Sequence, residues 1–260
     1  MDMKKTGLLL ILAASLAARA GAQDFGNERD FRVTPMGSGV VITEYLGTDV
    51  HVKIPAHVQG RPVTGIADLA FARRGLLSVT IPDGVVSIGD WAFSDNRLAE
   101  VVLGESLTFI GYAAFFNNDI ANLALPEKLA FIGDHAFNSN RLSVLSIPNS
   151  VVSLGLGSFA NNRLIGVNIG NRVVSFGDNV FHNNFLTNIT IGGGIDSLNE
   201  GIFAGALRYV SRIVIGMNVN LSDAAPSDVV WQGFSDAYRS NGYRAGVYTL
   251  HNGRWHFQAN

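Results

Sequence analysis

Carboxylates recur at a fixed spacing through the middle of the chain and are the first candidates for chemistry. Five acidic residues lie at multiples of 22 residues: Asp68, Asp90, Asp134, Asp178 and Glu200. Each comes shortly before a phenylalanine, where a carboxylate can cap the start of a short helical segment. Calcium binding is the alternative, but single carboxylates in separate repeats do not supply the roughly six to eight oxygens that this ion takes. We therefore predict no metal site along this column.

No other residues form a constellation typical of an enzyme. The histidines share no position in the 22-residue spacing; they are His51, His57, His135, His182, His251 and His256. Only His251 and His256 are close neighbours, and they lack the intervening glutamate of a zinc protease motif. No G-x-S-x-G elbow occurs, and the lack of cysteine excludes thiolate metal sites and cysteine nucleophiles. The sequence thus predicts no catalytic residue, no cofactor-binding residue and no cofactor.

Asparagine and glycine also recur every 22 residues. The asparagines are Asn96, Asn118, Asn140, Asn162 and Asn184. An asparagine amide can bond free backbone groups in a tight turn, so we assign these residues a structural role, with metal binding or catalysis as the alternative. The glycines are Gly89, Gly111, Gly133, Gly155 and Gly177. They indicate a bend that needs either a positive φ or the close approach of two backbone segments.

A phenylalanine every 22 residues sets the register of all these columns. Seven members keep the spacing: Phe71, Phe93, Phe115, Phe137, Phe159, Phe181 and Phe203. Leucine, isoleucine and valine occupy further positions in the same register, among them Ile88, Leu98 and Val101. Periods of about 20 to 50 residues are typical of solenoids and propellers, in which neighbouring repeats bury a shared core.

Within one repeat, the run L-x-x-V-x-I predicts a short strand with one buried face. Pro82, Pro126 and Pro148 end this strand in three of the repeats. The following I-G-x-x-A-F segment is expected to return through a tight bend. Parallel pairing of one strand per repeat gives about seven coils and a body about 30–35 Å long, at roughly 4.8 Å per strand.

The repeat I-G-x-x-A-F-x-x-N-x-L-x-x-V-x-I-P-x-x-V resembles the treponemal, or BspA-like, class of leucine-rich repeats over about residues 40–220. Ala67 and Asn199 replace the glycine, and Arg74 and Ala206 the asparagine, in the outer repeats, which cap the core. The resemblance implies a leucine-rich-repeat solenoid of the α/β class, with short parallel strands and tight or short helical returns. Members of the class are typically exported bacterial proteins associated with adhesion to host matrix proteins, other bacteria or host cells.

Four segments are expected along the chain. Residues 1–22 combine a charged start, an apolar run and a small-residue cleavage pattern, which predict a signal peptide cut after Ala22. An uncleaved anchor is the alternative. Residues 23–50 predict an N-terminal β cap, residues 51–220 the solenoid, and residues 221–260 a capping module. Since no lipoprotein cysteine is present, we expect a secreted, cell-surface or periplasmic protein with no transmembrane segment after signal removal.

Both caps carry local patterns of their own. Short alternating runs around Gly37 predict a strand pair over the first coil. Residues 228–239 show helical spacing of aromatic residues behind Ser227 as the expected N-cap, and residues 245–257 alternate around Asn252-Gly253, as in a β-hairpin. The aromatic residues are expected to form the core of the cap. Alternatively, some of Trp231, Tyr248 and Trp255 form a stacking platform for glycan or peptide.

The residues that alternate with the buried ones on the predicted strands should face outward, and we call them the strand face. They are Ser78, Thr80, Glu100, Val102, Asn122, Ala124, Val144, Ser146, Gly166, Asn168, Asn188 and Thr190. Because they are almost uncharged, they suit extended contact with a protein or polar polymer rather than with phosphates. Three arginines precede the strands and three acids follow them, either as a solvated rim or to orient a partner: Arg97, Arg141, Arg163, Asp83, Glu105 and Glu127.

The formal net charge of −2 argues against a nucleic-acid partner. The sequence therefore predicts a non-enzymatic exported interaction module, acting in cell-surface adhesion or in binding host or matrix proteins through the strand face. A periplasmic or envelope scaffold without a host ligand is the first alternative. Glycan-processing or glycan-binding activity in the C-terminal module is the second.

Overall fold

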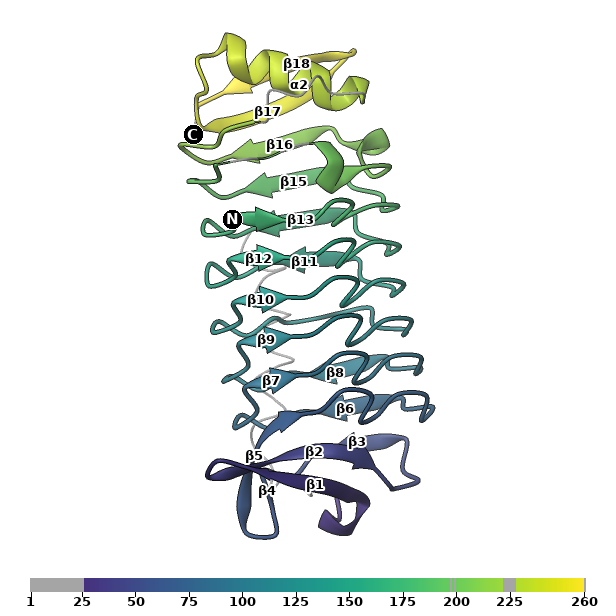
Figure 1. Cartoon of the computed structure of the whole chain (residues 1–260). Coiled ribbons are helices and arrows are strands. Elements are labelled where there is room, and N and C mark those ends of the chain that lie inside the picture. Colours follow the sequence, from purple (N-terminus) through teal and green to yellow (C-terminus); the bar gives the residue numbers. More distant parts are fainter. Residues whose placement is uncertain (1–25, 197, 199, 222–227, 260) are drawn as a thin grey trace, which may run out of the picture.

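Successive coils of the chain stack into an elongated solenoid of about eight turns (Figure 1). The computed structural model describes residues 26–196, 198, 200–221 and 228–259, so the expected signal peptide and Ser227 lie outside the described residues. A β cap closes one end of the solenoid, and a helix with a β-hairpin closes the other. The predicted solenoid with two caps is confirmed.

The strands expected from the L-x-x-V-x-I runs form parallel ladders on one side of the solenoid. One ladder has three strands: β3 (His51–Lys53), β6 (Ser78–Thr80) and β8 (Glu100–Val102). A second begins with β11 (Val144–Ser146), β13 (Gly166–Ile169), β15 (Asn188–Ile191) and β16 (Arg212–Ile215). Residues 122–124 form no strand and separate the two ladders, so the strand expected in that coil is wrong. Asparagine and alanine, which strands disfavour, occupy its outward positions.

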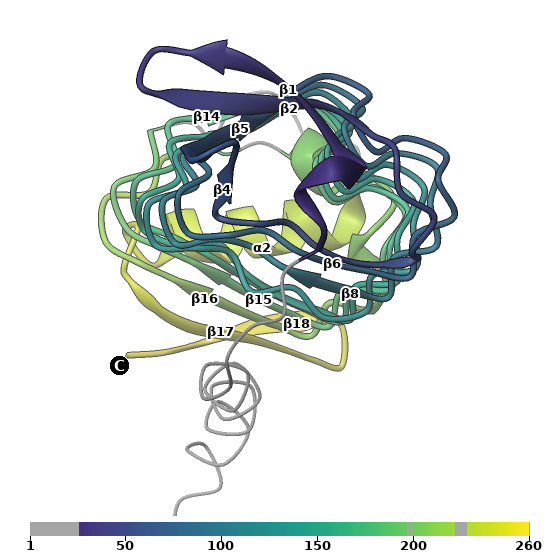
Figure 2. The same cartoon turned by 90° about the horizontal axis from the view of Figure 1, so that it is seen from below.

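A second set of very short strands lies where a tight bend was expected. These strands are β7 (Ser87–Ile88), β9 (Phe109–Ile110), β10 (Phe131–Ile132), β12 (Ser153–Leu154) and β14 (Ser175–Phe176). They pair in parallel, each with the strand of the neighbouring coil. Seen along the solenoid axis, this sheet lies on the opposite side of the coil from β6, β8 and β15 (Figure 2). Most coils therefore carry two strands, and the expectation of a single strand per coil is wrong.

The N-terminal cap extends the second set of strands. A 3-10 helix, η1 (Glu28–Asp30), leads into the antiparallel pair β1 (Phe31–Met36) and β2 (Gly39–Tyr45). β2 then pairs in parallel with β5 (Arg61–Ile66), which also pairs with β4 (His57–Val58) and β7. The predicted strand pair thus covers the first coil and satisfies its edge.

At the other end, the coils finish with η2 (Glu200–Phe203) and η3 (Leu207–Tyr209) before β16. Helix α2 (Val229–Ser240) and the hairpin β17 (Gly246–His251) and β18 (Arg254–Gln258) follow, with β17 antiparallel to β16. The N-cap of α2 is Asp228, whose Oδ1 accepts hydrogen bonds from the backbone N–H groups of Val230 and Trp231, rather than the expected Ser227.

The seven repeated phenylalanines form one internal file, and each is 0% exposed. Successive ring centroids lie 4.8, 5.1, 5.1, 5.4, 6.1 and 5.5 Å apart in stacked pairs. This spacing follows the rise of about 4.8 Å between paired strands and suits offset aromatic stacking. Tyr45 continues the file beyond Phe71, and Trp231 contacts Phe203 at the other end. The caps therefore close the core with further aromatic rings.

The repeated asparagines are buried and join neighbouring coils. Asn140 is typical: its Nδ2 donates to the backbone oxygens of Phe115 and Phe137, and its Oδ1 accepts from the backbone N–H of Ile120. The same pattern recurs at the other four asparagines of the column. These amides satisfy backbone groups that the turn leaves without backbone partners.

The repeated carboxylates act between coils rather than as caps of their own segment, where a helix was expected. The Oδ1 of Asp68 accepts from the backbone N–H of Asp90, and the Oδ1 of Asp90 from that of Tyr112. Asp134 accepts from Leu156 in the same way. The segments that follow Asp68, Asp90 and Asp134 are turns, so they have no helix start for a carboxylate to cap.

The repeated glycines lie where two coils approach each other closely. A Cβ added to Gly133 would lie 2.7 Å from the backbone carbon of Gly111, and one on Gly177 would lie 2.2 Å from the backbone nitrogen of Leu156. None of the five has a positive φ. The left-handed positions fall two residues later instead, as at Trp91 and His135, with φ of 56° at both.

Candidate functional site

The structure places all twelve residues of the strand face at the surface. Ser78, Thr80, Gly166 and Thr190 are half-buried, and the other eight are exposed. In β11, β13 and β15 the registers bring Val144, Gly166 and Asn188 into one row, and Ser146, Asn168 and Thr190 into the next. β6 and β8 form a shorter face of the same kind. Asn122 and Ala124 are exposed between the two ladders, outside any strand.

Sequence reasoning missed the two ends of this surface. His51 and Lys53 of β3 lie beside Ser78 and Thr80, and Arg212 of β16 lies beside Asn188. The first of these strands precedes the next by 27 residues instead of 22, because this coil is lengthened by the hairpin that β4 forms with β5. The row through Val144, Gly166 and Asn188 therefore continues to the basic Arg212, whereas the row through Ser146, Asn168 and Thr190 continues to Val214.

Few side chains of the strand face form hydrogen bonds with one another or with their neighbours on adjacent strands. His51 Nδ1 lies 2.9 Å from Ser78 Oγ, and Asn168 Nδ2 lies 3.4 Å from Ser146 Oγ. Glu100 is the one charged residue among the twelve. The face thus offers hydroxyl, amide and small apolar groups to a partner, and among these strands β8 adds the carboxylate.

The charged rims are exposed. Arg141 forms an ion pair with Asp119, with Nη2 and Oδ1 2.7 Å apart, on the side that leads into the strands. Arg97 and Arg163 are exposed on the same side, and Asp83 and Glu127 follow the strands. An exposed ion pair of this kind contributes little to stability, so these charges are available to orient a partner.

The C-terminal aromatic residues are mostly core. Trp231 is 3% exposed and Tyr248 is 0% exposed, so neither can offer a stacking platform. Trp255 is half-buried, and its Nε1 donates to the backbone oxygen of Val230 at 3.3 Å. Burial raises the pKa of Tyr248 to about 12, and it also raises the pKa values of Tyr45 and Tyr238. The three tyrosines whose pKa values are raised are therefore neutral packing residues of the two caps.

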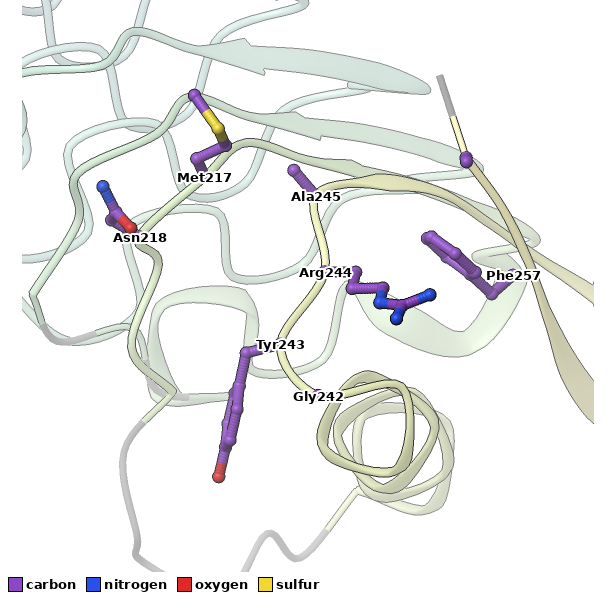
Figure 3. A pocket seen from close by; sticks show the side chains of 8 residues that line it. Met217, Asn218, Gly242, Tyr243, Arg244, Ala245 and Phe257 are labelled. Carbon is purple, nitrogen blue, oxygen red and sulfur yellow. The ribbon is translucent and has the colours of Figure 1, made fainter.

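A shallow depression of about 410 Å³ lies beside the C-terminal cap (Figure 3). Met217, Tyr243, Arg244 and Phe257 contribute side chains to it. Met217 and Tyr243 are 72% and 55% exposed, and Arg244 is exposed as well. A site held by such open side chains has no buried polar group to orient a small ligand.

Within the residue ranges that the structure describes, no three histidine or carboxylate side chains converge to hold a metal ion. No helix in these ranges has the length and apolar character needed to cross a lipid bilayer.

A repeat solenoid with an accessible, nearly uncharged strand surface is the class of protein that this geometry defines. The model of the BspA type leucine rich repeat region matches residues 64–187 and 131–222, with six copies. The chain belongs to this family. Proteins of the family are typically interaction modules rather than enzymes.

Solved structures show the same fold. A leucine-rich repeat protein from T. pallidum is 22% identical, with a TM-score of 0.56 over 85% of this chain and 97% of that chain. One from Bacteroides ovatus is 19% identical, with a TM-score of 0.54 over 78% of this chain and 56% of that chain. No curated protein matches the sequence significantly.

Proposed function

We propose that this protein is an exported, non-catalytic interaction module whose strand face binds a protein or a polar polymer in cell-surface adhesion. The proposal rests chiefly on the rows formed by β11, β13 and β15, which align accessible, uncharged side chains in register. A flat surface with few charges can contact an extended partner without the cost of desolvating ions. Membership of an interaction-module family supports the same reading.

The direct test is a binding screen of residues 23–260 against immobilised matrix proteins and cell-wall glycans. For any partner found, the double variant Val144→Glu, Asn168→Glu places two carboxylates on adjacent strands of the face. We expect it to weaken binding at least about tenfold, since hot-spot positions lie near the centre of an interface. Val229→Glu is the matched control, because Val229 is 83% exposed on α2. Equal binding by both variants would contradict a role for the strand face.

Location separates adhesion from the envelope-scaffold alternative. Protease added to intact cells should remove a surface-exposed protein and leave a periplasmic one intact. Protection in intact cells, together with cleavage after the outer envelope is opened, would contradict the adhesive role.

A further inference from the structure

The sheet of two-residue strands carries an exposed apolar surface that the strand face does not include. Its largest outward side chains are Val86, Phe109, Phe131 and Val174, which are 44%, 43%, 47% and 68% exposed. Val152 lies in the same 22-residue column as Val86 and Val174, and it is half-buried. We call these five residues the lateral face.

The two phenylalanines are not required by the repeat. Phe109 and Phe131 lie in register on β9 and β10, and the strands on either side have Ser87 and Ser153 at the same position. A serine therefore satisfies the fold at this place in other coils. An exposed aromatic pair that the fold does not need indicates a contact surface.

The lateral face is continuous along the solenoid axis. The backbone N–H of Thr108 donates to Val86, that of Ala130 to Thr108, that of Val152 to Ala130 and that of Val174 to Val152, at 2.9 to 3.0 Å. Four steps of about 4.8 Å give the lateral face a length of about 19 Å from Val86 to Val174. Thr108 and Ala130, which complete the column, are uncharged and half-buried.

Carboxylates border the lateral face on both sides. The Asp83 rim precedes the short strands and consists of Asp83, Glu105 and Glu127. The Asp90 rim follows them and consists of Asp68, Asp90, Asp134 and Asp178. Among the described residues, no lysine or arginine forms an ion pair with Asp83, Asp90 or Asp134. The basic residues beside the lateral face are Lys128 and Arg172, both toward the C-terminal end of the Asp83 rim.

We propose that the lateral face binds a basic amphipathic helix of a partner polypeptide. An α-helix is about 10–12 Å wide and rises about 1.5 Å per residue, so roughly 13 residues span the length of the lateral face. Its apolar stripe would lie on Phe109 and Phe131, and its lysine or arginine side chains would reach the two acidic rims. The positive charge of the partner should gather toward Asp83 and Asp90, away from Lys128 and Arg172. This surface is separate from the strand face and does not depend on the adhesive role.

The test uses residues 23–260 and two labelled peptides of about 14 residues, followed by fluorescence anisotropy. One peptide has leucines at positions i, i+3, i+4 and i+7 flanked by lysines, and the other has the same composition in permuted order. We expect the amphipathic peptide to bind at least about tenfold more tightly than the permuted one. Phe109→Ser with Phe131→Ser should remove that preference, and Asp90→Asn with Asp134→Asn should weaken binding several-fold and reduce its salt dependence.

Val144→Ser is the control, because Val144 is 53% exposed on the opposite sheet. It should leave peptide binding unchanged, whereas it tests the strand face in the adhesion assay, so the two proposals fail separately. Retained far-UV circular dichroism and melting temperature show that each variant is folded. Equal binding of the two peptides, or unchanged binding by the Phe109→Ser, Phe131→Ser variant, would overturn the proposal. Sedimentation that shows a dimer lost in this variant would overturn it in favour of self-association.

Discussion

Replacing Asn140 with alanine is expected to destabilise the solenoid at a position where no hydrophobic group is lost. The three shortest hydrogen bonds of its amide join the backbone oxygens of Phe115 and Phe137 and the N–H of Ile120. The residue is 7% exposed, so water has little access to these groups.

The three groups are not affected equally. The oxygen of Phe115 still accepts from Asn118, and that of Phe137 still accepts from Asn162. The N–H of Ile120, in contrast, has the Asn140 amide oxygen as its acceptor. One orphaned buried donor costs about 1–3 kcal/mol, and each of the two lost secondary bonds about 0.5–1.5 kcal/mol. We therefore expect a loss of about 2–6 kcal/mol in the free energy of unfolding.

Urea unfolding followed by circular dichroism measures this loss, and amide hydrogen exchange at Ile120 locates it. Asn122→Ala is the matched control, since Asn122 is exposed and has no side-chain hydrogen bond in the described structure. It should change the unfolding free energy by less than about 0.5 kcal/mol. A loss below about 1 kcal/mol for Asn140→Ala, or unchanged exchange at Ile120, would refute the role assigned to the amide.

Three further predictions concern the core, the coil contacts and the C-terminal cap. Phe137→Ala should cost about 3–5 kcal/mol in chemical denaturation, because Phe137 is 0% exposed in the aromatic file, and a change below about 1 kcal/mol would contradict its placement. Gly133→Ala should lower stability by about 1–3 kcal/mol because the added Cβ would lie 2.7 Å from the backbone of Gly111, whereas Gly166→Ala, with its nearest contact at 3.9 Å, should be nearly neutral; equal melting temperatures would contradict this. Tyr248 has its pKa raised to about 12, so the folded state holds its proton more tightly; stability should be full below about pH 10 and fall as pH approaches 12. Tyr248→Phe should fall less over that range in urea titrations, and parallel curves would count against burial as the cause.

Much of the strand face could be predicted because the repeat converts local pattern into long-range contact. A residue in one coil lies beside the residue 22 positions later, as Gly166 lies beside Asn188. The alternation within the strand then decides which side chains face out. Lys53 and Arg212 escaped prediction because insertions break the constant spacing at both ends. Asn122 and Ala124 keep the spacing but lie between the two ladders.

The lateral face could not be predicted in the same way. Strands of two residues, such as β9 and β10, are too short to leave a periodic signal. They exist because stacked coils pair their backbones. The 22-residue spacing places Phe109 beside Phe131, but only the structure shows that both side chains are exposed. The glycine column was similar: its pattern allowed either a positive φ or a close approach, and the packing of adjacent coils selected the close approach.

By itself, the sequence determined the period, the buried aromatic file, the strands that precede Pro82 and Pro148 and the identity of both caps, because each follows from which residues repeat and how often. The tertiary structure alone decided the set of two-residue strands, the break at residues 122–124 and the partners of the repeated carboxylates. Those features depend on backbone groups of one coil meeting those of the next, and all residues supply such groups regardless of their side chains.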